Sequence, residues 1–381
     1  MNISMLVLNN FTNDARVHKE ATTLASAGYN VTVVALWQPG LAQVERQSGY
    51  QVIRLRLLSR PWQNRLLSPP IKYLEFAWRV WQLAGREPAH VYHANDANTL
   101  PAAWLGAHRN HAKLIYDAHE LETGRSFSSS KISKIYRKIW VFPERIFIHR
   151  TNCVITVSSS IAAELAEIYD IPLPQVILNC PEKSAILVSD RLRKELNIHE
   201  SQKIILYQGV VTAGRGLEAF LNATQVLENT VGVILGDGPA LKVFRDQVRS
   251  GEWQRVYFPG KVSLTDLPIY TASADLGIVL TQDTCLNHHY SLPNKLFEYM
   301  HAGLPVICSD LPEMARVVRD YQVGELTDPG DPSAIVNSIK SILADPVRFA
   351  QMKANTLNAS NDFNWQNESK KLVEIYRSIN S

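Results

Sequence analysis

Two charged residues stand in the mainly apolar stretch "SLPNKLFEYMHAGLPVICS", residues 291–309. Lys295 falls in the first turn of a predicted helix, where the helix dipole disfavours a cation unless an anion lies nearby. Glu298 follows one turn later among apolar neighbours, so its carboxylate must pair or face a polar ligand. A local Lys295–Glu298 pair is the simpler interpretation, but such pairs contribute only roughly 0.2–0.5 kcal/mol. A nucleoside diphosphate satisfies both groups, because phosphate suits Lys295 and the helix amides, and a ribose diol suits Glu298.

Boundary residues predict where this helix begins and ends. Ser291 is a candidate N-cap and Pro293 suits the first turn, whereas Gly303 ends the helix and Pro305 prevents its resumption. The helix is therefore expected to be short and to lead directly into a buried strand.

Strand-like runs rich in Val, Ile and Leu alternate with helical patterns along the whole chain. The predicted strands are 3–8, 31–36, 52–57, 90–93, 113–116, 154–157, 204–207, 231–235, 256–258, 276–280 and 305–308. Continuous apolar strands separated by helices indicate parallel sheets covered on both faces. We therefore expect an α/β protein with two doubly wound domains, residues 1–185 and 186–362. A C-terminal helix over 363–381 is expected to pack back on the first domain.

Open parallel sheets bind ligands at the carboxyl ends of their strands, so the shared site is expected in an interdomain cleft. The first strand-to-helix loop, "NNFTNDAR", lacks a GxGxxG pattern, which disfavours a dinucleotide-binding dehydrogenase. Asn13, Asp14 and Arg16 lie there and could contact phosphate or acceptor, although Asn13 also suits a helix cap. No DxD-like pair of acids follows a strand at this edge, so neither a metal nor a cofactor is predicted.

Composition is that of a soluble globular protein, with 46% hydrophobic residues and a formal net charge of +3. The N-terminus lacks the basic flank and cleavage site of a signal peptide, and no apolar run is long enough to span a membrane. The four cysteines stand far apart, without metal-ligand or disulfide spacing. A cytoplasmic protein with no nucleic-acid partner is expected.

Basic and aromatic residues are interleaved in two parts of the first half. Residues 54–86 and 125–150 each hold seven basic side chains and one acidic one, with Trp, Phe and Leu among them. This mixture is typical of a peripheral contact with an anionic membrane surface. Solvated helices whose aromatic residues face the core are the alternative interpretation.

The order of several motifs resembles a known family. "DARVHKEATTLASAGYNVTVVAL", "VYHANDANTLPAAW", "LIYDAHELE", "LYQGVVTAGRGLEAFL" and "SLPNKLFEYMHAGLPVICSD" are similar, in order and spacing, to the family 4 retaining glycosyltransferases, the glycosyl transferases group 1. The resemblance covers nearly the whole chain. It implies the GT-B fold of two Rossmann-like domains and a nucleotide diphosphate-sugar as co-substrate.

The resemblance also implies roles for particular residues. Glu298 matches the glutamate that holds the ribose hydroxyls, and Arg215 the cation that neutralises the donor diphosphate. His119 matches a histidine that reaches the donor sugar and the reacting region. Val262 falls where main-chain groups meet the nucleobase, and Gly209 ends the first strand of the second domain.

The chain departs from the family pattern at two positions. Tyr290 stands where the first glutamate of the Glu-x7-Glu motif is expected, and Val210 replaces an arginine after Gly209. Lys295 and the backbone around Leu292, Pro293 and Asn294 are the candidates that take over these contacts.

We therefore expect a retaining, metal-independent glycosyltransferase that serves a glycan or lipid-linked acceptor in polysaccharide or lipopolysaccharide biosynthesis. Two alternatives remain at this point, a nucleotide-sugar 2-epimerase and a non-catalytic nucleotide-sugar binding protein. The Tyr290 departure keeps the second of these open.

Overall fold

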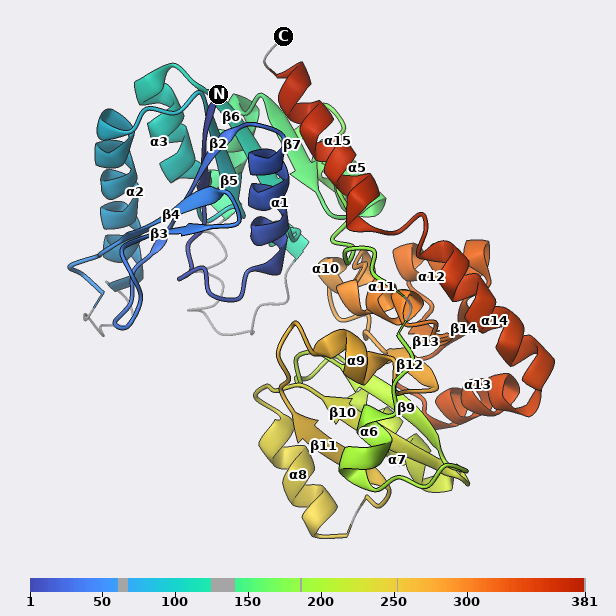
Figure 1. Cartoon of the computed structure of the whole chain (residues 1–381). Coiled ribbons are helices and arrows are strands. Elements are labelled where there is room, and N and C mark those ends of the chain that lie inside the picture. The colour runs from blue at the N-terminus through green and yellow to red at the C-terminus, as the bar shows by residue number, and fades with distance from the viewer. Residues whose placement is uncertain (61–67, 125–140, 186, 252, 380–381) are drawn as a thin grey trace. The chain divides into compact units, whose positions relative to one another are not determined.

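The chain forms two compact units. The computed structural model describes residues 1–60, 68–124, 141–185, 187–251 and 253–379 (Figure 1). Unit 1 comprises Met1–Leu178 and Glu368–Ser381, and unit 2 comprises Asn179–Asn367. The first boundary follows Leu178, whereas the sequence predicts it at residue 185. The polar stretch that suggested the later boundary belongs to unit 2.

Unit 1 is a twisted sheet with helices on both faces. Its elements are β1 (Asn2–Leu6), α1 (Ala15–Ser26), β2 (Asn30–Leu36), β3 (Val44–Gln47), β4 (Tyr50–Leu55), α2 (Ser68–Arg86), β5 (Val91–Asn95), α3 (Leu100–Asn110), β6 (Lys113–Ala118), η1 (Glu122–Gly124), a helix over 141–147, η2 (Ile148–Arg150), β7 (Cys153–Thr156), α5 (Ser159–Tyr169) and β8 (Gln175–Val176). Within the described residues the strand order is β3-β4-β2-β1-β5-β6-β7-β8. The connections from β1 to β2 and from β4 to β5 run in opposite directions along the sheet. Right-handed crossovers therefore put α1 on one face and α2 and α3 on the other (Figure 1).

Two strands of unit 1 were not predicted. β3 pairs antiparallel with β4, and β8 pairs with β7 over only two residues. β3 alternates exposed and half-buried side chains in the sequence "VERQ", so no apolar run marks it. The sheet is parallel, as predicted, except for β3 at this edge.

The C-terminal helix α15 (Trp365–Ser378) reaches unit 1 in its residues from Glu368 on. The hydroxyl of Tyr376, which is fully buried, lies 2.7 Å from Nδ1 of His93 on β5, and its ring packs near that of Tyr29. Glu368 accepts a hydrogen bond from the backbone N–H of Leu178. These contacts hold α15 against unit 1 at His93 of the central strand β5 and at the backbone just after the edge strand β8.

Unit 2 repeats the architecture with a fully parallel sheet. Its elements are α6 (Arg191–Leu196), β9 (Lys203–Gln208), α7 (Leu217–Val226), β10 (Thr230–Leu235), α8 (Leu241–Arg249), β11 (Val256–Gly260), α9 (Leu267–Thr271), β12 (Leu276–Val279), α10 (Leu286–His289), α11 (Asn294–His301), β13 (Val306–Ser309), α12 (Pro312–Tyr321), β14 (Gly324–Thr327), α13 (Pro332–Ala344) and α14 (Pro346–Ala359). Among the described residues the order is β11-β10-β9-β12-β13-β14. β14 was not predicted, because "GELT" carries no apolar run.

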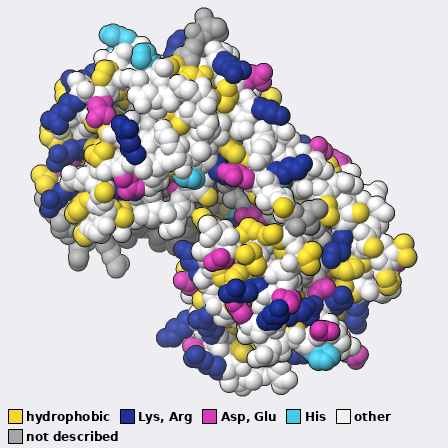
Figure 2. Space-filling model, in the orientation of Figure 1, with side chains coloured by type: hydrophobic (Ala, Val, Ile, Leu, Met, Phe, Trp, Pro, Cys, Tyr) yellow, Lys and Arg dark blue, Asp and Glu magenta, His cyan; other side chains and the backbone are white. Residues whose placement is uncertain are grey.

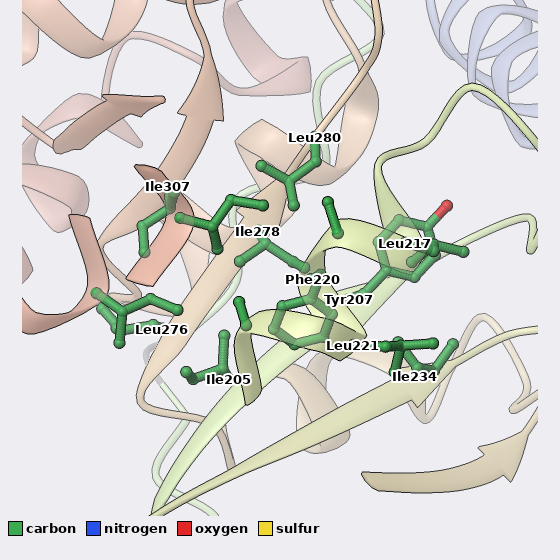
Figure 3. Packing of buried hydrophobic residues seen from close by; sticks show 14 of the residues in the cluster. Ile205, Tyr207, Leu217, Phe220, Leu221, Ile234, Leu276, Ile278, Leu280 and Ile307 are labelled. Atoms are coloured by element: carbon green, nitrogen blue, oxygen red, sulfur yellow. The ribbon is translucent and has the colours of Figure 1, made fainter. Parts of the chain in front are cut away.

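The core of unit 2 lies between the central strands and the helices α7 and α13. Figure 3 shows Phe220 of α7 packed toward Ile205 of β9 and Ile278 of β12, and Leu221 of α7 near Ile234 of β10. These side chains are almost completely buried, so they fix β9 and α7 relative to each other. The loop between these two elements, which carries Arg215, is thereby held at the carboxyl edge of the sheet.

None of the helices in the described part of the chain combines the length and the hydropathy that a membrane span requires.

Candidate functional site

The predicted helix of the signature stretch is α11. Pro293 is its N-cap residue, with φ −70° and ψ 140°, and Asn294 is the first helical residue. The Ser291 hydroxyl donates to the backbone oxygen of His288 at 2.8 Å, so the prediction that Ser291 caps the helix is wrong. Gly303 follows the helix with φ 70°. The chain runs from the carboxyl end of β12 through α11 to the amino end of β13. The free amides at the beginning of α11 therefore point out of the carboxyl edge of the sheet.

Lys295 lies in the first turn of α11, close to the end of β9. Its Nζ is 3.8 Å from the ring centroid of Tyr207 and would be 3.2 Å from a Cβ placed on Gly209. Across the residues that the structure describes, Nζ makes no hydrogen bond or ion pair, and thus none with Glu298. Burial, and then the positive charge of Arg215, lowers the pKa of Lys295 to about 7.

Arg215 is a second cation at the same edge. It extends from the loop between β9 and α7, where Gly214 and Gly216 adopt φ values of 78° and 60° that make a tight turn. Its guanidinium is half-buried and donates one long hydrogen bond, 3.4 Å, to the hydroxyl of Thr281. No carboxylate in the described residues forms an ion pair with it. Two partly desolvated cations and a helix N-terminus therefore converge without a counter-ion from the described residues, which is the electrostatic requirement of an anion site.

Glu298 is half-buried and is held by a chain of hydrogen bonds. The side-chain amide of Gln208, at the end of β9, donates to Glu298. The hydroxyl of Thr271 in turn donates to Oε1 of Gln208 at 2.8 Å, and the Gln208 backbone N–H bonds to Tyr299. These partners fix the Glu298 carboxylate one turn along α11 from Lys295. A carboxylate in this position can accept hydrogen bonds from a vicinal diol.

The other predicted residues of unit 2 follow β9, α10 and β11 or stand at the start of α11. Leu292 is buried and Asn294 is exposed at the start of α11, and Tyr290 follows α10 with its ring edge-to-face against His289. Val262 follows β11 at the sheet edge, two strands from β9. Val210 is 60% exposed beside Gly209, so the position of the missing arginine faces solvent.

His119 lies between two carboxylates of unit 1. Its Nε2 is 3.1 Å from Asp117 and its Nδ1 is 3.4 Å from Asp96. Burial alone would lower the pKa of His119, but the charges of Asp96 and Asp117 raise it to about 9. The imidazole is therefore a cation at neutral pH. Asp96 has φ 66°, an unusual conformation for a residue with a side chain, directly after β5.

Arg16 is buried and paired with other groups of unit 1. It is 5% exposed, donates to both oxygens of Asp117 at 2.9 and 3.0 Å, and donates to the Ile177 backbone oxygen at 3.0 Å. A guanidinium occupied in this way has no free donor edge for phosphate or acceptor, so the expected contact is replaced by a structural role. Asp14, rather than Asn13, caps α1 by accepting from the N–H of Val17. Asn13 instead donates to the hydroxyl of its neighbour Thr12, at 3.4 Å.

Two further buried groups complete the cluster around Asp117. Ligand atoms of Glu20, His93 and Asp117 lie within 4.8 Å of one another, close enough to hold a metal ion. Arg16 already supplies a cation there, 2.9 Å from Asp117 and 3.0 Å from Glu20. Burial lowers the pKa of His93 to about 4, so this ring is neutral while it bonds to Tyr376. The donor set therefore suits an internal guanidinium better than a metal.

Sequence reasoning missed Gln208, Asp96 and Glu20. Gln208 and Asp96 both stand at or directly after the carboxyl end of a strand, which is a signal that could have been used for them. Glu20 gives no such signal, because it reads as an ordinary charged residue of an amphipathic helix. Only its complete burial separates it from a solvent-facing residue.

Comparison with known families covers both units. The model of the glycosyl transferases group 1 matches residues 188–359, and that of glycosyltransferase family 4 matches residues 15–180. The chain belongs to the group 1 glycosyltransferases. Both units of this glycosyltransferase thus match the family that the motifs resemble.

Individual relatives are distant in sequence but match 94–100% of the chain. An uncharacterised glycosyltransferase of Methanocaldococcus jannaschii is 25% identical over 377 residues, 94% of this chain and 92% of the relative. Sucrose-phosphate synthase from Thermosynechococcus elongatus has a TM-score of 0.81 at 18% identity, over 100% of this chain and 99% of its own. WaaG, a glycosyltransferase involved in lipopolysaccharide biosynthesis, has a TM-score of 0.71 at 15% identity, over 98% and 99%. These structures confirm the GT-B fold.

The buried Glu20 of this group 1 glycosyltransferase makes its stability depend on pH. Burial raises the pKa of Glu20 from 4.5 to about 8, although Arg16 opposes the shift. The folded protein therefore keeps a proton that the unfolded chain releases, and stability falls as the pH rises from 4.5 to 8. Glu20→Gln removes this pH-dependent loss of stability. The Tm of the variant minus that of the wild type is therefore expected to increase by about 5 °C from pH 5 to pH 8.

Thermal unfolding at a series of pH values measures this difference. The matched control is Glu167→Gln on α5, because Glu167 is exposed. A Tm difference between Glu20→Gln and the wild type that stays constant from pH 5 to pH 8 would show that Glu20 is ionised in the folded protein.

Proposed function

We propose that this glycosyltransferase moves a sugar, with retention of anomeric configuration, from a nucleotide diphosphate-sugar to a glycan or lipid-linked acceptor. The observation that carries the proposal is the pair of cations, Arg215 and Lys295, which have no counter-ion among the described residues and lie beside the N-terminus of α11. Glu298, held by Gln208 one turn further along, supports a ribose at the same site. Tyr290, Leu292 and Asn294 are proposed to border the donor.

Stabilisation of the leaving group is the proposed source of catalysis. As the bond between the anomeric carbon and the phosphate oxygen breaks, its electron pair passes to the diphosphate while the sugar becomes oxocarbenium-like. Fixed positive charge from Arg215, Lys295 and the helix amides lowers the energy of that state. The acceptor oxygen then bonds to the anomeric carbon on the same face, and its proton passes to the departing phosphate oxygen.

His119 is proposed to contact the donor sugar as a cation. Both of its ring nitrogens face carboxylates, and its pKa of about 9 leaves it protonated at neutral pH. An imidazolium donates hydrogen bonds and cannot accept a proton. Because both N–H groups already face Asp96 and Asp117, the imidazolium is proposed to act on the donor sugar through its positive charge, and the transfer step above needs no separate base.

The reaction is proposed to need no metal or cofactor, since two side-chain cations already face the expected diphosphate. Polysaccharide or lipopolysaccharide biosynthesis is the proposed context. WaaG, which shares the fold and is involved in lipopolysaccharide biosynthesis, supports this context by analogy alone.

We also propose that unit 1 contacts anionic lipid through α2. Leu74, Trp78 and Trp81 are 67%, 50% and 43% exposed and recur at helical spacing, so they form one apolar stripe. Arg79 and Arg109 stack on the two tryptophan rings, Arg109 at 3.8 Å. Figure 2 shows Lys and Arg side chains interspersed with hydrophobic ones over this side of unit 1. Residues 125–140 of the second basic stretch lie outside the described residues.

Nucleotide binding tests the donor site. A panel of UDP-, GDP- and ADP-sugars is expected to contain at least one that raises the Tm by about 5 °C at a concentration 100-fold above its Kd. Glu298→Ala is expected to weaken that nucleotide about 10-fold to 100-fold, because a hydrogen-bonded charged group is lost. Differential scanning fluorimetry measures both, with and without EDTA, and chelation is expected to change nothing.

The matched control for the panel is Glu228→Ala, an exposed glutamate of the same unit. If no nucleotide shifts the Tm, or if the Glu298 and Glu228 variants respond alike, the donor site is wrongly assigned. Incubation of the donor without acceptor separates the alternatives. An epimerase converts the sugar nucleotide, whereas a non-catalytic binder leaves it intact even when acceptors are added.

Vesicle co-sedimentation tests the α2 contact. Wild-type protein is expected to sediment with vesicles containing phosphatidylglycerol at low salt and to be released at high salt, because surface charge is screened. Leu74→Gln combined with Trp78→Gln is expected to weaken partitioning about tenfold or more, since two apolar side chains no longer enter the interface. Val347→Gln, at an apolar site of unit 2 that is 80% exposed, is the control. Equal sedimentation of the two variants would refute the α2 contact.

A further inference from the structure

Because Gly209 has no side chain, Lys295 lies close to the backbone at the end of β9. Nζ would lie 3.2 Å from a Cβ at this position, and Gly209 has φ 124°, so no other residue fits here without strain. The ring of Tyr207 lies 3.8 Å from Nζ and covers one side of the ammonium. Lys295 is thus half-buried, and the Tyr207 ring and the Gly209 backbone on these two sides give it no hydrogen bond or ion pair.

The titratable groups around Lys295 come from each element packed against it. Arg215 approaches from the loop before α7, Glu298 and Tyr299 from α11, Tyr207 from β9, and Cys308 from β13. Burial raises the pKa of Tyr207 to about 12 and the pKa values of Tyr299 and Cys308 well above neutrality, so these groups are uncharged. The Glu298 carboxylate is the one anion of this set, and it already accepts a hydrogen bond from Gln208.

Burial and the positive charge of Arg215 are unfavourable to a Lys295 ammonium in the free protein, and Glu298 and the ring of Tyr207 offset them only in part. Burial removes its hydration and Arg215 repels it, and the pKa of Lys295 falls to about 7 as a result. A diphosphate bound between Arg215 and Lys295 would reverse this repulsion. Its negative charge attracts the ammonium more strongly, at short range, than the positive charge of Arg215 repels it.

We propose that Lys295 takes up a proton when a nucleoside diphosphate binds, so that donor binding is coupled to pH through this one side chain. The inference rests on the donor site proposed above and adds a property to it. Arg215 is the permanent cation of the pair, whereas Lys295 becomes fully protonated only when the ligand binds. The site is then less strongly self-repelling when empty than a pair of arginines would be.

The direction of the pH dependence follows from the two states of the lysine. Above pH 7 the free protein loses the Lys295 proton, whereas the complex retains it, so affinity falls as the pH rises. From pH 7.0 to pH 8.5 the affinity for UDP or GDP is expected to fall about tenfold. The diphosphate contributes little to this change, because its last phosphate ionisation, with a pKa of about 6, lies below this window.

Isothermal titration calorimetry of the full chain tests the proposal with UDP and GDP as probes. At pH 8.0, in two buffers of different ionisation enthalpy, binding of the nucleotide is expected to take up about 0.9 proton. Lys295→Arg keeps a permanent charge and is expected to bind with almost no proton uptake and with an affinity that stays constant from pH 7.0 to 8.5. Lys295→Met is expected to bind more weakly at pH 7.0, also without uptake.

Two controls keep these outcomes distinct. Lys242→Met removes an exposed lysine of α8 and is expected to behave as the wild type in both measurements. Circular dichroism checks that each variant is folded. If Arg does not fit beside Gly209, the Lys295→Met variant alone provides the test of proton uptake.

Tight binding by the wild type with no proton uptake would overturn the proposal and leave the proposed function standing. Uptake that persists in the Lys295→Arg and Lys295→Met proteins would assign the proton to another group and also overturn it. If neither nucleotide binds the wild type, the donor site itself fails, and this inference fails with it.

Discussion

The separation of two partly buried cations from the carboxylates of the described residues is the feature on which the function of unit 2 depends. Arg215 and Lys295 repel each other, and the dipole of α11 adds to the positive field. Such an arrangement is unfavourable by itself and must be maintained by the rest of the fold. The packing of β9, α7 and β12 in the core and the hydrogen bonds of Gln208 and Tyr299 supply that support.

Unit 1 uses the same residue types in the opposite way. Arg16 is as basic as Arg215, but Asp117, Glu20 and a backbone oxygen surround it, so it joins α1 to β6 and the end of β8. The difference between a structural and a ligand-binding arginine is therefore whether a carboxylate of the protein already pairs with it. Asp117 extends this network to His119, which is left as a partly exposed cation at the carboxyl edge of the sheet.

The sequence predicted the central strands of both sheets, because each is a continuous apolar run that is buried on both faces. It did not predict β3, β8 and β14, because these edge strands are only two to four residues long and carry no continuous apolar run. Lys295 could be selected because a cation in the first turn of a helix conflicts with the dipole, and Glu298 because its neighbours are apolar. Arg215 was selected only from the resemblance to the family motif. Arg16 was misjudged and Gln208 was missed for one reason: pairing partners that are distant in sequence decide their roles, and these partners appear only in the fold.

The most direct test of this account is a crystal structure of the protein with a nucleoside diphosphate bound. The account predicts that the phosphates lie within hydrogen-bonding distance of Arg215, Lys295 Nζ and the first amides of α11, with both ribose hydroxyls on Glu298. Phosphates bound elsewhere, with Arg215 and Lys295 still unpaired at this edge, would contradict it.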